Sequence, residues 1–134
     1  MLASVWSQLN YPAVLVAGLI HMVSNLLWFS PLLFGKAWAE LTKSDSKPAV
    51  RWMPAGILGH LLVALVLAVF IALAQATTVA GGIAIGILAW VGFVVPLEVG
   101  ELIWEKIPFK LFGIRVGCHF VAMGLVGALL AVWR

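Results

Sequence analysis

The chain has 134 residues, of which 64% are hydrophobic and only 10% are charged, and its formal net charge is +3. In soluble domains about a quarter of the residues are charged, so this composition excludes a soluble globular protein. No basic domain is available to lie along a nucleic-acid duplex, so we expect no nucleic-acid partner. The composition indicates an integral membrane protein with the lipid bilayer as its first partner.

The first ten residues, MLASVWSQLN, lack the basic segment that opens a signal peptide. We therefore expect the apolar segment that follows to be retained as a membrane span. Val5, Trp6 and Leu9 recur at helical spacing before Pro12. Two interpretations stay open for this leader, a short helix lying in the membrane interface or a frayed end.

Four segments are long and apolar enough to cross a bilayer. The run from Trp52 to Leu97 contains no Asp, Glu, Lys or Arg over 46 residues, roughly twice the ~20 residues that one crossing needs. It must cross twice, with its turn between Ala74 and Gly82, where polar residues and glycines interrupt the aliphatic pattern. We predict an all-α, four-transmembrane-helix bundle forming a single domain over residues 1–134. Its helices are expected at about 11–34, 53–75, 79–103 and 111–133, with a cytoplasmic loop at 35–52.

The basic residues indicate the orientation. Seven of the eight fall in or beside the loops that follow the first and third spans, and only Arg134 is left for the other side. By the positive-inside rule, both of these loops face the cytoplasm and both termini lie outside, in a bacterial inner membrane. The seven are Lys36, Lys43, Lys47, Arg51, Lys106, Lys110 and Arg115.

Two segments resemble each other. LWFSPLLFG, residues 27–35, and IWEKIPFKLFG, residues 103–113, both place Trp, then Pro, then Leu-Phe-Gly at the cytoplasmic end of an odd-numbered span. If they are a repeat, the bundle consists of two similar helical hairpins of one orientation. Chance resemblance between two interfacial segments is the alternative.

The same segments carry a resemblance to a family. WFSPLLFGKAW (28–38) and PFKLFGIRVGCHFVAMGLVGALLAVW (108–133), with GILAWVGFVVP (86–96) between them, resemble the small bacterial membrane proteins catalogued as domain of unknown function 1761. The resemblance spans nearly the whole chain. It implies a four-span protein without an assigned activity, and it supplies no catalytic residues.

Three of the five acids form one stripe. Glu98, Glu101 and Glu105 are spaced by three and four residues, so they project from one helix face. One interpretation is an ion-pair network with the nearby bases. The other is a proton or substrate site at Glu98, which is the deepest of the three and follows Pro96, a residue whose missing N–H frees a backbone carbonyl.

All four spans carry polar residues at similar depth, although charges inside a bilayer are costly and should turn inward to meet one another. We therefore predict a polar cavity near the cytoplasmic face. Its candidate residues, for proton or substrate binding, are Glu98, Glu101, Arg115, His119, His60 and Asn25. His21, nearer the midplane, is interpreted as a hydrogen-bonded packing residue.

His60 and His119 lie at almost the same depth. Facing each other they suit a haem, and with Glu98 they suit a divalent metal. No helix has the Glu-x-x-His spacing of a di-metal bundle, so the cofactor stays unknown. Arg115 and His119, four residues apart, suit an anionic headgroup instead. The single cysteine, Cys118, is expected to be a small buried hydrophobe.

Glycine pairs predict the helix packing. Gly82 with Gly86 and Gly113 with Gly117 form small-xxx-small patterns on the third and fourth spans. Such faces let helices approach closely, within one chain or between subunits. Because four short helices leave little room for a pore, we expect a homo-oligomer or a subunit of a larger membrane complex.

Three functional hypotheses remain. The first is a non-enzymatic assembly or accessory subunit, in which the acidic stripe is structural. The second is an oligomeric proton-coupled small transporter that uses Glu98, assisted by His119 and His60. The third is a haem- or metal-binding protein that uses His60 and His119. Hydrolytic catalysis is not expected, because no Ser, Thr or Cys has an identifiable base and orienting group.

Overall fold

The computed structural model describes residues 2–45 and 47–134, so positions 1 and 46 of the predicted domain lie outside the described residues. The described chain is helical and contains no β-strand. In chain order the elements are α1 (Leu2–Gln8), α2 (Tyr11–Trp28), α3 (Gly35–Thr42), a 3₁₀ turn η1 (Val50–Trp52), α4 (Met53–Leu73), α5 (Val79–Ala89), a π-helical segment η2 (Trp90–Val94), α6 (Val95–Trp104) and α7 (Phe109–Val132).

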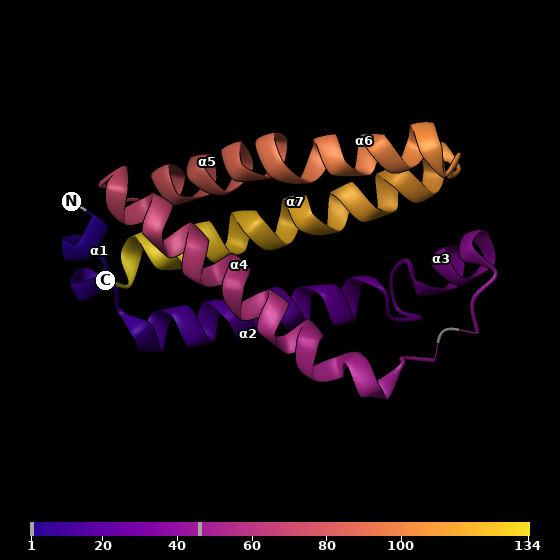
Figure 1. The fold of residues 1–134 in the computed structure, drawn as a ribbon, viewed down its shortest axis with the longest axis horizontal. Coiled ribbons are helices and arrows are strands. Elements are labelled where there is room, and N and C mark those ends of the chain that lie inside the picture. The colour runs from indigo at the N-terminus through magenta and orange to yellow at the C-terminus, as the bar shows by residue number, and fades with distance from the viewer. Residues whose placement is uncertain (1, 46) are drawn as a thin grey trace.

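Four of the described segments are long and apolar enough to cross a membrane: Tyr11–Trp28, Val50–Leu73, Val79–Trp104 and Phe109–Val132. The predicted all-α bundle with four membrane-spanning helices is thus confirmed. Both chain ends lie at one end of the bundle, named here the terminal end (Figure 1). The opposite end, named here the loop end, carries α3 and the turn between α6 and α7.

α2 has clear boundaries. The Asn10 side chain accepts a hydrogen bond from the backbone N–H of Ala13 at 3.1 Å, which caps the helix start where Pro12 already fixes the backbone. The helix ends at Trp28, six residues before the predicted limit at Phe34. Pro31 disfavours helical geometry at the residue before it, and the Ser30 carbonyl accepts the N–H groups of Leu33 and Gly35 in a tight turn.

That turn leads into α3, a short helix within the predicted cytoplasmic loop that the sequence pattern did not reveal. Gly35 is required at its start, because a Cβ there would lie 2.3 Å from the Phe29 carbonyl oxygen. Trp38 of α3 meets Phe29 edge to face, with ring centroids 5.9 Å apart. The loop is therefore folded back against the end of α2.

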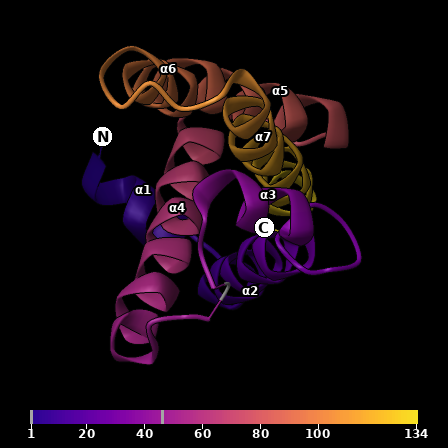
Figure 2. The same ribbon diagram turned by 90° about the vertical axis from the view of Figure 1, so that its right-hand side faces the viewer.

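α7 is the central helix of the bundle, since it packs on α2, α4, α5 and α6 (Figures 1 and 2). Its tightest contact is with α5. A Cβ on Gly82 would lie 2.0 Å from the Gly127 carbonyl oxygen, and a Cβ on Gly86 would lie 2.3 Å from that of Met123. The two backbones are thus in direct contact, the arrangement that small residues permit between membrane helices.

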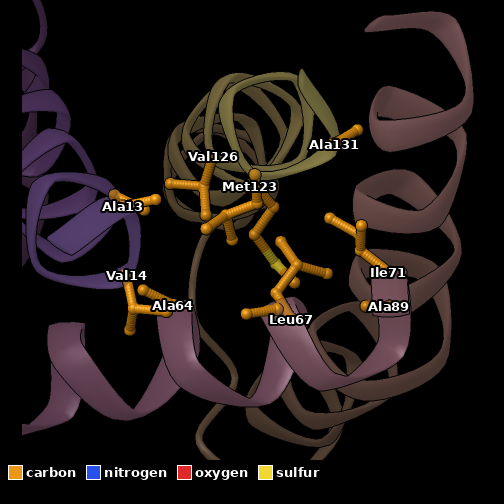
Figure 3. Packing of buried hydrophobic residues seen from close by; sticks show 12 residues of the cluster. Ala13, Val14, Ala64, Leu67, Ile71, Ala89, Met123, Val126 and Ala131 are labelled. Atoms are coloured by element: carbon orange, nitrogen blue, oxygen red, sulfur yellow. The ribbon is translucent and has the colours of Figure 1, made fainter. Parts of the chain in front are cut away.

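Small and β-branched side chains fill the space where α2, α4 and α7 converge (Figure 3). Ala13 of α2 and Ala64 of α4 are fully buried, and Leu67 of α4 and Val126 of α7 belong to the same buried cluster. In a bilayer the lipid is as apolar as these side chains, so close packing rather than exclusion of water holds the helices together.

The third span is continuous from Val79 to Trp104 but changes its winding in the middle. At η2 the Val95 N–H donates to the Trp90 carbonyl, five residues back, instead of four. Pro96 follows directly; it lacks an N–H, and its ring would crowd a carbonyl of the preceding turn. The wider π turn accommodates this, and such segments frequently occur at functional sites.

Two indoles anchor the central helix. The Trp28 N–H donates to the Ile114 carbonyl at 2.9 Å, and the Trp90 N–H donates to the Val116 carbonyl at 2.8 Å. Trp28 lies over Gly117, where a Cβ would be 3.1 Å from the indole. Trp104, which corresponds to Trp28 in the two similar segments, is instead 84% exposed. The sequence similarity of those segments therefore does not extend to the roles of their tryptophans.

Candidate functional site

All three histidines of the chain meet inside the bundle, and we name them the histidine cluster: His21 of α2, His60 of α4 and His119 of α7. The Nδ1 atoms of His21 and His60 lie 2.7 Å apart, a hydrogen bond in which one ring donates and the other accepts. The rings of His21 and His119 stack with centroids 5.9 Å apart. The three imidazoles thus come from three different helices, and His21 contacts the other two.

A glycine brings the first two histidines together. A Cβ on Gly18, one helical turn before His21, would lie 2.7 Å from the Leu61 side chain and 3.3 Å from the Leu61 Cα. A larger residue at this position would require the Leu61 side chain to move and α4 to shift away from α2 by a few tenths of an ångström. Because His60 neighbours Leu61, the close approach brings the two imidazoles within hydrogen-bonding distance.

His21 is the only buried polar side chain among the described residues, at 2% exposure. Its Nδ1 bonds to His60, while its Nε2 has no hydrogen-bond partner in the described chain. A buried polar atom without a partner is costly, and more so in a membrane than near water. A group of this kind calls for a ligand or a function.

Two hollows adjoin the cluster. One, named here the midspan cavity, has a volume of about 450 Å³ and is walled by α4, by the α5–η2 junction with Phe93 and Val94, and by Met123. Among the described residues, His21 and His119 are the polar ones that line it. The other, named here the loop-side pocket, has a volume of about 390 Å³ and is lined by Asn25, Trp38, Lys47 and His60 with three apolar residues. The cluster therefore lies between an apolar hollow in the span and a hollow at the loop end that carries the amide of Asn25 and the charge of Lys47.

The acidic stripe forms a separate group. Arg115 of α7 contacts the Glu101 carboxylate directly, and its guanidinium is 3.7 Å from the Glu98 carboxylate. Glu105 is exposed, and no ion pair joins it to a base of the described chain. One base thus serves two acids of α6, which ties this helix to α7 near the loop end.

The predicted cavity residues therefore divide into two groups. His60 and His119 join the histidine cluster, and Asn25 donates from its side chain to the His21 carbonyl at 2.9 Å. Glu98, Glu101 and Arg115 form the ion-paired group instead. Of the four predicted packing glycines, Gly82 and Gly86 contact α7, Gly117 faces Trp28, and a Cβ on Gly113 would meet nothing within 4 Å.

The described residues contain no group of three or more His, Cys, Asp or Glu side chains arranged to hold a metal ion. His60 has His21 as its nearest ring neighbour, and Glu98 is engaged by Arg115. Cys118 is buried at 1% exposure and unpaired.

Sequence reasoning assigned His21 to packing and did not identify η2 or the midspan cavity. A signal for His21 was present: it lies near the middle of its span, one turn after Gly18, a residue that permits close helix contact. The cavity had no such signal, because its walls are ordinary aliphatic residues whose separation depends on the angle between helices.

The model of a family described as protein of unknown function (DUF1761) matches residues 12–131. The chain belongs to this family. No curated protein and no solved structure matches it. Membership of the DUF1761 family assigns no activity, so the function has to be argued from the site.

Proposed function

We propose that this DUF1761 protein is a small proton-coupled membrane transporter whose proton-carrying site, the histidine cluster, also conducts protons along the membrane potential when no substrate is bound. The observation that carries the proposal is the contact of His21 with both His60 and His119, between the loop-side pocket and the midspan cavity. An intramembrane ionisable group marks an ion or substrate path by default, and chains of histidines serve as proton relays.

Imidazole suits this task because it binds a proton at one nitrogen while it releases one from the other. His60 lines the loop-side pocket, from which a proton can enter, and its Nδ1 bonds to His21. His21 and His119 line the midspan cavity, where the transported molecule would lie. The other charged groups nearest this path are Lys47 in the pocket and Arg115, one turn before His119.

The histidines replace Glu98 as the favoured proton site. The Glu98 carboxylate lies 3.7 Å from the Arg115 guanidinium, so it takes part in the ion pairs that join α6 to α7. A residue held in this way contributes to the fold more readily than to proton exchange.

We expect valinomycin-driven proton uptake by liposomes containing the wild-type protein to exceed that of protein-free liposomes. His21→Leu should reduce the uptake to the protein-free level, because it removes the imidazole that contacts the other two. Uptake is followed with a pH-sensitive dye trapped inside the liposomes. Glu98→Gln serves as the comparison and should retain most of the flux.

Folding is checked by monodisperse elution in detergent, and if His21→Leu fails this check, His60→Gln at the partly exposed end of the cluster takes its place. Absence of wild-type flux would overturn the proposal. So would flux that survives the histidine variants and disappears in Glu98→Gln.

A second candidate is the non-enzymatic assembly or accessory subunit. It is favoured by the ion pairs of Arg115, which give the acidic stripe a structural use in holding α6 against α7. The proton-uptake assay distinguishes the two candidate functions. An accessory subunit would carry no proton flux, while Glu101→Gln would still lower the yield of folded protein.

A further inference from the structure

The structure points to a ligand-binding site in the midspan cavity, and we propose that it takes a bilayer-dissolved apolar molecule carrying one hydroxyl group, such as an alkylphenol or a long-chain alcohol. The hydroxyl would bond to the unpartnered Nε2 of His21. This inference goes beyond proton carriage, since binding requires no flux. If the protein is the transporter proposed above, the same molecules are its substrate class.

The size and lining of the cavity set the apolar part of the ligand. At about 450 Å³ the cavity falls within the range of small-molecule sites, roughly 300–1,000 Å³. The side chains that α4 contributes run from Leu62 to Phe70 and are all apolar. Phe70 also stacks on Phe93 of η2, with ring centroids 6.2 Å apart. An aromatic or aliphatic body fits these walls, whereas a charged one does not.

The burial of His21 determines where the polar group of the ligand would bind. The ring lines the cavity and is 2% exposed, and its Nδ1 is engaged by His60, which is not a lining residue. The edge left for a ligand is therefore Nε2, which has no partner in the described chain. The other lining histidine, His119, stacks on the His21 ring and closes the polar corner of the cavity.

The hydrogen bond between the histidines selects a hydroxyl. In the neutral pair one Nδ1 carries the proton and the other accepts it. If His21 donates at Nδ1, its Nε2 is an acceptor; if it accepts there, its Nε2 carries the proton and donates. A hydroxyl both donates and accepts, so it satisfies Nε2 in either tautomer, whereas a carbonyl or an amine cation satisfies only one.

The cavity opens toward the lipid, which indicates a ligand that is dissolved in the membrane. Leu62, Val66 and Phe93 line the cavity and are also exposed on the outer face of the bundle, at 50%, 48% and 62%. The face that these spans present outward is the lipid-facing one, so the ligand enters sideways from the bilayer.

The test compares 4-hexylphenol with hexylbenzene, which has the same apolar body and lacks the hydroxyl, in thermal unfolding of the full chain in mild detergent. A ligand that binds only the folded state raises the midpoint. We expect 4-hexylphenol at saturation to raise it by about 5 °C and hexylbenzene by much less. Val66→Trp, which fills the cavity from α4, should abolish the rise. Leu58→Trp, at an exposed position of α4 outside the cavity, should retain it.

His21→Phe should remove the difference between the two probes, since an aromatic ring remains but both nitrogens, including the unpartnered Nε2, are lost. Equal stabilisation of the wild type by both probes would overturn the proposal, because the cavity would then take any acyl chain. An equal response of Val66→Trp and Leu58→Trp would overturn it as well, because binding would lie elsewhere. Leu62→Trp replaces Val66→Trp if the latter does not fold. Binding without proton flux would reject the transport proposal alone.

Discussion

Gly127→Ala is expected to prevent stable folding of most of the protein. A Cβ at this position would lie 2.2 Å from the Gly82 carbonyl oxygen and 2.9 Å from its carbonyl carbon, both backbone atoms that cannot rotate away. α5 and α7 would have to separate along their tightest contact, and the Trp90 bond to Val116 would be stretched with them. The cost should reach about 3 kcal/mol, the upper range for overpacking. Unfolding in mixed detergent and SDS micelles measures it.

Gly124→Ala is the matched control on the same helix. A Cβ there meets nothing within 4 Å, so the change should be neutral or slightly stabilising because alanine favours helix over glycine. If Gly127→Ala lowers the free energy of unfolding no more than Gly124→Ala does, α5 and α7 do not touch at Gly127. Gly82→Ala, on the opposing helix, should reproduce the effect of Gly127→Ala.

Arg115→Leu is expected to have a comparable effect through charge rather than shape. It leaves Glu98 and Glu101 without a base at the end of a membrane span. Removal of one partner from a fully buried ion pair costs about 3–5 kcal/mol, because the remaining charge is poorly solvated. The side chains of Arg115 and Glu101 are 27% and 35% exposed, so the loss here should be about 3 kcal/mol, at the lower end of that range. The same detergent unfolding measures the loss, and the yield of folded protein should fall with it.

The rescue variant makes this prediction specific. Arg115→Leu combined with Glu98→Gln and Glu101→Gln carries no unpaired charge and should regain most of the lost stability. Lys110→Leu, an exposed base of the same helix, should change stability by less than about 1 kcal/mol. If the triple variant is no more stable than Arg115→Leu, the role of Arg115 is packing by its long side chain instead of ion pairing.

The number and approximate position of the membrane spans could be predicted because they depend on local composition. The uncharged run from Trp52 to Leu97 must fold as two spans, and its turn falls between α4 and α5 as expected. The end of α2 was predicted at Phe34 but lies at Trp28. Apolar residues continue past Trp28, whereas Pro31 and the turn at Ser30 end the helix. Hydropathy reports the membrane environment of a residue but not its backbone hydrogen bonds.

The candidate site was predictable only in part. The depth of His60 and His119 along their spans follows from residue counting, and the structure brings both to His21. The pairing of Glu98 and Glu101 with Arg115, in place of Lys106 or Lys110, requires the rotation of α6 relative to α7. The sequence shows which face of α6 is acidic, but the base that this face meets depends on how α6 packs on α7, whose own sequence is apolar on most sides.

The sequence by itself determined that the chain is a membrane protein with four spans, and that its basic residues gather at one end. Those properties follow from the transfer of side chains into lipid, which each segment experiences separately. Only the tertiary structure decided which polar groups meet. Close backbone contacts at Gly18 and at Gly82 with Gly127 fix how the helices turn toward one another, and these contacts join residues far apart in the chain. The histidine cluster and the midspan cavity follow from those contacts, because helix rotation determines which side chains face inward.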